Sequence, residues 1–340
     1  MEFRLYRDGM LMDRVEVGPM DETQVPVLEY REPFYTDAFD GDWAARNKAN
    51  GTHHRLDETR GGKVKYSHFV HTFYSIIPPD KYFEEHPEYF SEIEGRRTAD
   101  RAQLCLTNPD VLRIATQQVY RWIEENPGIR VVSVSQNDCA GFCECERCAE
   151  VNRAEGSPSG SLLRFVNAIA DSVAKRYPGV MIETLAYTWS EKPPRNLKAR
   201  PNVIIRLCHM SPACNVHSLY RECPENRAYI EHLKEWRNHA EHIWVWEYTT
   251  DFKAYLMPFP NLDAVLRDPK FYREHGVRGL FYEGSYPPGG GGEMAELRAW
   301  VLAKLMWNPD LNGRKLVQEF IQGVYGPAAH YVQQYVDLLH

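Results

Sequence analysis

Short apolar runs alternate with amphipathic segments along most of the chain, and this alternation constrains the fold more than any other feature. Strands that alternate with helices form parallel sheets, and eight such units close into a barrel. We therefore predict an α/β fold, a (β/α)8 barrel, which suits a length of 340 residues. The eight predicted strands are residues 25–30, 66–74, 103–106, 131–135, 181–187, 203–207, 243–248 and 279–282.

The segments between the apolar runs carry helix signals. Residues 108–110 (Asn-Pro-Asp) combine a capping residue, a proline suited to the first helical position and an acid at the positive end of the helix dipole. Apolar residues then recur at helical spacing, as they do in the later segments. Beyond this first helix, we expect helices at residues 162–173, 224–236 and 294–305, and extra helical structure at residues 316–339.

The first residues do not fit the barrel. Residues 3–6 and 10–12 flank an Asp-Gly turn and predict a small hairpin. We expect residues 1–20 to be this hairpin or the remnant of a preceding domain, and residues 21–340 to be the barrel. The N-terminus shows no basic segment followed by an apolar stretch, so we expect no signal peptide and, by default, a cytoplasmic location.

Charge and hydropathy exclude two classes of partner. The formal net charge of −7 argues against a nucleic-acid-binding protein, because phosphate binding needs clustered lysine and arginine. No apolar run approaches the ~20 residues that cross a membrane. We therefore expect neither nucleic acid nor membrane as a partner.

Three carboxylates stand at or after predicted strand ends, where barrel enzymes carry their catalytic groups. Asp138 follows the fourth strand, Glu247 lies in the seventh and Glu283 follows the eighth. Glycoside hydrolysis needs one carboxylic acid to protonate the leaving oxygen and a second group to stabilise or attack the sugar carbon. Aromatic neighbours raise a carboxyl pKa by desolvation, which suits a general acid. The sequence thus predicts a glycosidase that needs no cofactor for catalysis.

Polar and aromatic residues near the same strand ends are candidates for binding the substrate, a glycan. They are Asn137, Tyr30, His71, Tyr187, Trp189, His209, Trp246, Tyr248 and Tyr282.

A cysteine-rich loop follows the fourth strand. Cys143, Cys145 and Cys148 have the spacing C-x-C-x-x-C, whereas Cys105 stands alone in the sequence. A structural zinc ion needs four such ligands, so these three predict a structural zinc site beside the active site, with disulfides or free thiols as alternatives. The candidates for a fourth ligand, or for a partner, are Cys139, Cys214, His217 and Cys223.

The stretch 132–138 (Val-Ser-Val-Ser-Gln-Asn-Asp), followed by 143–148 (Cys-Glu-Cys-Glu-Arg-Cys), resembles a family long catalogued as a domain of unknown function and now placed in glycoside hydrolase family 163. Residues 43–47 and the segment 223–236 resemble it too. The resemblance implies endo-β-N-acetylglucosaminidase activity on N-glycans, with cleavage of a β-linked N-acetylglucosamine bond.

Similarity to the wider group of barrel glycosidases implies particular roles for the carboxylates. Asp138 would take the strand-four acid position and Glu247 would be the strand-seven carboxylate. Because Asp138 is shorter than the glutamate common at that position, it could instead orient a substrate amide or a water, with Glu283 as the competing acid. If the substrate is an N-acetylglucosaminide, its own acetamide oxygen could attack the anomeric carbon.

Two other functions stay open from the sequence. One is a metal-dependent barrel hydrolase, in which His68, His71, His209 and Asp138 would bind a catalytic ion. The other is a carbohydrate-binding barrel without catalytic activity, which would keep the aromatic residues but lack a functional acid.

Overall fold

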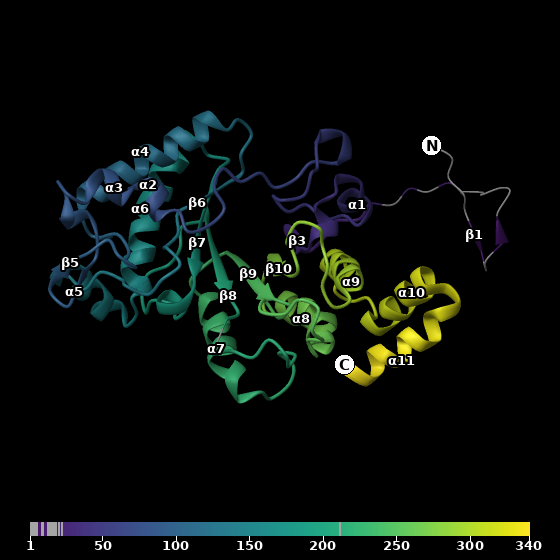
Figure 1. Cartoon of the computed structure of the whole chain (residues 1–340). Helices are drawn as coiled ribbons and strands as arrows, with labels where there is room; N and C mark the ends of the chain where they lie inside the picture. The colour runs from purple at the N-terminus through teal and green to yellow at the C-terminus, as the bar shows by residue number, and fades with distance from the viewer. Residues whose placement is uncertain (1–5, 8–9, 12–18, 20, 22, 211) are drawn as a thin grey trace.

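A sheet of parallel strands forms the centre of the computed structural model, which describes residues 6–7, 10–11, 19, 21, 23–210 and 212–340 (Figure 1). The spatial order of its six strands is β3-β10-β9-β8-β7-β6. Strands β6 to β10 follow one another in sequence, and β10 then pairs in parallel with β3, so the sheet curls as a half-barrel. The strands are β3 (Tyr30–Phe34), β6 (Val131–Ser133), β7 (Met181–Ala186), β8 (Val203–Cys208), β9 (His242–Tyr248) and β10 (Gly279–Glu283).

Helices pack on the outer face of this sheet. In Figure 1, α4 and α6 lie together beside β6 and β7, and α9 lies beside β3. The side chain of Asn108 accepts hydrogen bonds from the backbone N–H groups of Asp110 and Val111, which confirms the predicted cap of α4. The main helices are α4 (Pro109–Glu125), α5 (Glu146–Glu155), α6 (Ser159–Arg176), α7 (Arg227–Trp236), α8 (Leu262–Glu274) and α9 (Ala295–Trp307).

The predicted eight-stranded barrel is only partly present among the described residues. The predicted second strand contributes a single parallel bridge between Tyr66 and Val131, and the predicted third strand a single antiparallel bridge between Phe90 and Leu104. The chain after Tyr66 still runs along β6, where the Ser67 N–H donates to the Val131 carbonyl at 3.2 Å. His71 then has a φ of +55°, which an extended strand cannot accommodate, and a helical turn, α2 (Phe73–Ile76), follows.

The first strand lies later in the chain than predicted. Val25 and Val27 are 84% and 56% exposed, and the strand starts only at Tyr30. The prediction was wrong because β3 contains Arg31 and Glu32, which look like surface residues yet are buried. Glu32 Oε2 accepts a hydrogen bond from the Tyr30 hydroxyl, and Glu32 Oε1 lies 2.9 Å from the backbone nitrogen and from Nδ1 of His53, which is distant in sequence.

Both ends of the chain extend beyond the sheet. Of the predicted hairpin, β1 (Tyr6–Arg7) pairs antiparallel with β2 (Met10–Leu11), while residues 3–5, 8–9 and 12 lie outside the described residues. The division at residue 20 stays a prediction. At the other end, α10 (Gly313–Tyr325) and α11 (Ala329–Leu339) replace one predicted helical segment, and α10 packs on α9. None of the helices in the described part of the chain is long and apolar enough to cross a membrane.

Short elements complete the described chain. They are η1 (Thr36–Phe39), α1 (Gly41–Arg46), η2 (Glu58–Arg60), α3 (Pro79–Tyr82), η3 (Pro87–Tyr89), β4 (Glu92–Ile93), β5 (Arg96–Arg97), η4 (Thr188–Ser190), η5 (Pro224–Asn226) and η6 (Gly326–Ala328).

The two faces of the sheet have separate cores. Successive side chains of a strand point to opposite faces. Val245 and Leu280 face outward and belong to the large core shared with the helices, whereas Trp244 and Phe281 belong to a smaller core inside the curl. This alternation decides which strand-end residues reach the interior of the half-barrel.

A buried ion pair lies in that interior. Arg206 Nη2 and Glu183 Oε2 are 2.7 Å apart, and neither side chain is exposed. Six aromatic rings surround the guanidinium group at 4.8 to 5.8 Å. Burial raises the pKa of Glu183, although the Arg206 charge opposes this shift. The next layer of inward-facing side chains toward the carboxyl end contains Leu185 and Cys208. They lie two residues after Glu183 and Arg206 on β7 and β8.

Candidate active site

A cavity of about 400 Å³ lies at the carboxyl ends of the parallel strands. Six of the residues predicted from the sequence line it. Its position is the one that active sites occupy in parallel barrels, and its size falls within the range of small-molecule sites, about 300–1,000 Å³. The predicted residues in its wall are His71, Asp138, Tyr187, Trp246, Tyr248 and Glu283.

Asp138 reaches the cavity from the loop after β6. Its side chain is exposed, and its Oδ1 accepts a hydrogen bond from the Tyr187 hydroxyl at 2.8 Å. The backbone on both sides is held by one buried side chain: Gln103 Oε1 accepts from the Asn137 N–H at 2.8 Å, and Gln103 Nε2 donates to the Cys139 carbonyl at 2.8 Å. The loop therefore presents a solvent-accessible carboxylate in a fixed place.

Glu283 ends β10 on the inner face of the sheet. Its side chain is half-buried, and its Oε2 accepts a hydrogen bond from the Trp246 indole N–H at 2.8 Å. Burial raises the pKa of the Glu283 carboxyl, and the Trp246 hydrogen bond opposes this shift only in part. A carboxylic acid that keeps its proton to higher pH is suited to proton donation.

Glu247 does not line the cavity. In the pairing of β9 with β10, Glu247 lies opposite Tyr282, and Tyr248 lies opposite Glu283. Glu247 is 5% exposed and points to the outer face. The prediction that Glu247 is a catalytic carboxylate at the strand ends was wrong, because the alternation of side chains along β9 places Glu247 between the sheet and the helices.

Hydrogen-bond donors surround the Glu247 carboxylate. His209 Nδ1 lies 2.9 Å from both carboxylate oxygens, Asn215 Nδ2 donates to Oε1 at 2.8 Å, and the Tyr272 hydroxyl donates to Oε2. The other ring nitrogen of His209 contacts Asn226 Oδ1 at 3.1 Å. Burial lowers the pKa of His209, but the Glu247 charge and the hydrogen bonds outweigh it, so that its pKa is raised. Both ring nitrogens of His209 thus have partners within the fold, and His209 does not line the cavity.

Three predicted substrate contacts pack within the fold and lie outside the cavity wall. Tyr30 is fully buried and stacks on Trp244, with ring centroids 4.6 Å apart. Tyr282 is 1% exposed and faces the helices with Glu247. Trp189 packs against Phe142 with centroids 5.6 Å apart. None of these three side chains belongs to the cavity wall.

Asn137, a predicted substrate contact, does not line the cavity, and its amide bonds to the backbone of neighbouring segments. Its Nδ2 donates to the Ala102 carbonyl at 2.8 Å, and its Oδ1 accepts from the Tyr74 N–H at 3.3 Å. The residue next to a candidate catalytic acid here serves to fix the backbone of that acid.

The sequence interpretation missed four residues of the wall: Leu185, Cys208, Met210 and Phe252. Cys208 and Met210 flank His209, so the alternation along β8 sends them inward and His209 outward. Cys208 is the last residue of β8, and extending the alternation two residues past the strand would also have found Met210. Phe252 comes from the loop after β9, where no periodic pattern applies.

The metal-dependent alternative finds no support among the described residues. Only two groups of three or more potential ligand residues have their ligand atoms within 4.8 Å of one another, and both consist of cysteines with at most one histidine. His68 stacks on Trp122 with centroids 3.8 Å apart, and His209 is held by Glu247. The proposed set of His68, His71, His209 and Asp138 is not brought together.

A family model described as "Domain of unknown function (DUF4838)" matches residues 12–337. The chain belongs to the DUF4838 family. This agrees with the coarser part of the resemblance noted in the sequence, whereas the description names no activity and no hydrolase family. A search of curated proteins found no match to this DUF4838 chain.

Solved structures similar to this DUF4838 chain include two glycoside-processing proteins. An O-GlcNAc hydrolase variant from Thermobaculum terrenum aligns over 88% of this chain and 64% of its own, with 10% identity and a TM-score of 0.49. An endo-glycoceramidase II from Rhodococcus sp., in complex with a five-membered iminocyclitol, aligns over 57% and 46%, with 13% identity and a TM-score of 0.37. This chain spans less than two thirds of the length of either protein.

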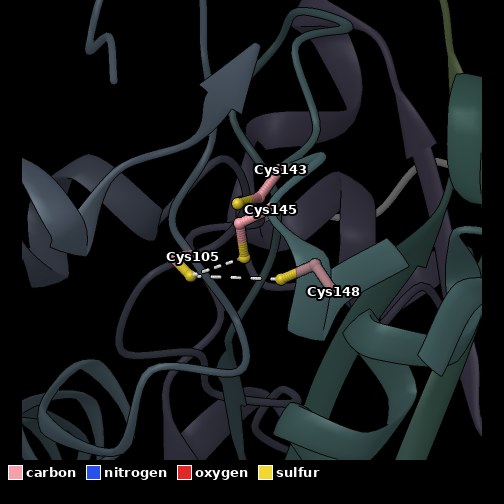
Figure 2. Close-up of side chains that lie close together, drawn as sticks. All are labelled: Cys105, Cys143, Cys145 and Cys148. Atoms are coloured by element: carbon pink, nitrogen blue, oxygen red, sulfur yellow. Dashed lines mark hydrogen bonds between the residues drawn. The ribbon is translucent and has the colours of Figure 1, made fainter. Parts of the chain in front are cut away.

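The cysteine loop of the DUF4838 chain gathers a different fourth residue from those predicted. Cys105 joins Cys143, Cys145 and Cys148 in one buried cluster (Figure 2). The prediction that Cys139, Cys214, His217 or Cys223 supplies the fourth residue was wrong, because the segment before α4 packs on the loop after β6 and brings Cys105 there. Cys214, His217 and Cys223 form a separate group, and Cys139 lies next to Gln103 instead.

Proposed function

We propose that this DUF4838 chain is a glycoside hydrolase that cleaves a β-linked N-acetylglucosamine-type bond. The observation that carries the proposal is the joint presence of Asp138 and Glu283 in the wall of one cavity at the strand ends. The two carboxylates differ in the way that acid catalysis of glycoside cleavage requires: one is exposed and hydrogen-bonded, and the other is half-buried with a raised pKa.

Glu283 is the proposed general acid. Protonation of the leaving oxygen needs a carboxyl group that holds its proton near neutral pH and touches the glycosidic bond. Glu283 has a raised pKa and faces the cavity beside Trp246. This assignment replaces Glu247 in our interpretation, because Glu247 lies on the other face of the sheet.

Asp138 is the proposed partner of the substrate acetamide. In substrate-assisted cleavage, the acetamide oxygen attacks the anomeric carbon, and an enzyme carboxylate has only to orient the group and stabilise the positive charge that develops on it. Asp138 is exposed to the cavity and fixed by Tyr187 and by the Gln103-held backbone. The resemblance to glycoside hydrolase family 163 in residues 132–148 supports an N-acetylglucosamine-containing glycan as substrate.

The aromatic wall supplies the binding surface. Trp246 and Tyr248 come from the inner face of β9, and Phe252 from the loop that follows it. Flat aromatic faces stack against the apolar C–H faces of sugar rings, whose hydroxyl groups remain free for polar contacts. A sugar seated against these rings would occupy the cavity that Asp138 and Glu283 also line.

Hydrolysis of chromogenic glycosides tests this function. We expect the wild-type protein to cleave aryl β-N-acetylglucosaminides or N-glycan oligosaccharides, and to leave the matched aryl β-glucoside, which has no acetamide, essentially uncleaved. On N-glycan oligosaccharides, whose leaving group is a sugar, Asp138→Asn and Glu283→Gln should each lower kcat by roughly 10²–10⁴, the usual contribution of a general acid or base. Binding of these glycans without any cleavage would contradict the proposal in favour of a binding protein, and equal rates on both sugars would contradict the role of the acetamide.

A further inference from the structure

Four cysteine side chains converge behind the active-site loop. Cys105 precedes α4, Cys143 and Cys145 lie in the loop after β6, and Cys148 lies in the first turn of α5. Figure 2 shows the four side chains gathered with their sulfur atoms close together. All four sulfur atoms lie within 4.8 Å of one another, and the four residues are at most 6% exposed.

We propose that Cys105, Cys143, Cys145 and Cys148 bind one structural Zn²⁺ ion. Zinc bound by four thiolates at about 2.3 Å in a tetrahedron requires sulfur atoms about 3.8 Å apart. The Cys105 sulfur lies 3.7 Å from that of Cys145 and 4.0 Å from that of Cys148. Four cysteines complete the coordination, and their burial leaves no open position for substrate, as in structural zinc sites.

The surroundings of the sulfur atoms are those of a thiolate cluster. The Glu92 N–H points to the Cys143 sulfur at 3.4 Å, and the Arg97 guanidinium group donates to the same sulfur at 3.6 Å. The Thr107 hydroxyl lies 3.1 Å from the Cys148 sulfur. Four thiolates around Zn²⁺ carry a net charge of −2, which donors of this kind and a nearby cation stabilise.

Zinc accounts for the cluster better than disulfides do. A disulfide joins two sulfur atoms at about 2.05 Å and would leave each pair independent of the other. Here all four cysteines are free, and Cys105 lies close to two sulfur atoms. A single ion at the centre explains why one residue from a distant segment meets three from one loop. Binding would release the thiol protons, since only thiolates coordinate the metal.

The ion would fix the loop that carries Asp138. Cys105 lies two residues after Gln103, whose side chain bonds to the backbone on either side of Asp138. Gly141, between Asp138 and Cys143, approaches the Arg101 carbonyl so closely that a Cβ there would lie 2.4 Å from its oxygen. Binding of Cys105 and the 143–148 loop to one ion would therefore hold the segment that contains Arg101 and Gln103 against the loop that contains Asp138 and Gly141. The metal site does not depend on the glycosidase proposal.

Metal analysis of the purified full chain tests the site. After dialysis against metal-free buffer, elemental analysis should find zinc bound to the wild-type chain. Cys105→Ser and Cys148→Ser should each lose one equivalent of zinc per chain. Cys214→Ser, which changes a cysteine of the separate group, should retain that equivalent and serves as the matched control.

A second measurement covers variants that fail to fold. In the wild-type protein, a mercurial thiol reagent should release one zinc ion as the four clustered cysteines react, and Co²⁺ in place of zinc should give the intense thiolate-to-cobalt absorption of a four-sulfur site. Zinc that is lost in Cys214→Ser but kept in Cys105→Ser would overturn the assignment. A wild-type chain that does not bind added Zn²⁺, disulfides among these four cysteines, or bound iron and sulfide would overturn it too.

Discussion

Glu247 and Glu283 stand one step apart in the β9–β10 ladder and point to opposite faces of the sheet. Glu247 pairs with Tyr282 on the outer face, and Glu283 pairs with Tyr248 on the inner face. The outer carboxylate is bonded to His209 and lies among the helices, whereas the inner one borders the cavity. Two glutamates with similar sequence surroundings are therefore expected to have separate roles, one in stability and one in catalysis.

Exchange of each glutamate for glutamine should separate these roles. Glu247→Gln removes the charge that His209 faces in a buried site, so we expect the free energy of unfolding to fall by about 1–3 kcal/mol, with kcat of the folded fraction nearly unchanged. Glu283→Gln removes a carboxyl whose ionisation burial disfavours, so Tm should stay level or rise while kcat falls. Thermal melts and active-fraction kinetics measure both. If Glu247→Gln lowered kcat and Glu283→Gln lowered the free energy of unfolding instead, Glu247 would be the general acid and Glu283 the structural residue.

The pH profile should respond to Trp246. As the proposed acid, Glu283 must be protonated, so kcat/KM should fall as pH rises through its raised pKa. The Trp246 N–H stabilises the ionised carboxylate, and its loss in Trp246→Phe should raise the pKa of Glu283 further. The alkaline limb of kcat/KM should therefore move to higher pH in Trp246→Phe. Phe252→Leu alters the wall without touching the carboxylate and should leave the limb in place; a shift to lower pH in Trp246→Phe would contradict the account.

Two tyrosines of the wall offer a matched pair of hydroxyl deletions. The Tyr187 hydroxyl donates to Asp138 at 2.8 Å, whereas the one contact of the Tyr248 hydroxyl within the described part of the chain is with the Met210 sulfur at 3.9 Å. A hydrogen bond to a charged group contributes about 1.5–3 kcal/mol, so Tyr187→Phe should lower kcat roughly 10- to 100-fold. Tyr248→Phe should change kcat much less. Equal effects in steady-state kinetics would show that Tyr187 does not act through Asp138.

Local patterns in the sequence were enough for much of the fold. The predicted strand 203–207 corresponds to β8 (Val203–Cys208), and 181–187 to β7 (Met181–Ala186). The cap of α4 at Asn108 was also predicted correctly. These features depend on residues a few positions apart, which a sequence displays directly.

Features that depend on distant partners were not predictable in this way. Glu32 is buried in β3 because His53 bonds to it, and Cys105 meets a residue 40 positions later in the chain. The positive φ of His71 depends on a tertiary contact as well, since its N–H donates to the Ser135 hydroxyl at 2.9 Å. Nothing in the neighbouring sequence signals these contacts.

The placement of Glu247 was within reach of sequence reasoning. Trp246 and Tyr248 flank it, and flanking residues of a strand point away from the residue between them. Neighbouring aromatic residues therefore could not desolvate Glu247 on its own face. Glu283 lies two residues after Phe281 on β10, so the two side chains point to the same face of the sheet. The structure places Phe281 inside the curl.

The dependence of the Glu283→Gln variant on the leaving group tests the central claim most directly. A sugar leaving group needs a proton from the acid, whereas dinitrophenolate is stable enough to leave unprotonated. We predict that Glu283→Gln lowers kcat/KM by roughly 10²–10⁴ for a β-N-acetylglucosaminide with a sugar leaving group, and by less than about tenfold for the dinitrophenyl glycoside. An equal loss on both substrates, or full activity on the sugar-leaving substrate, would contradict the assignment of Glu283 as the general acid.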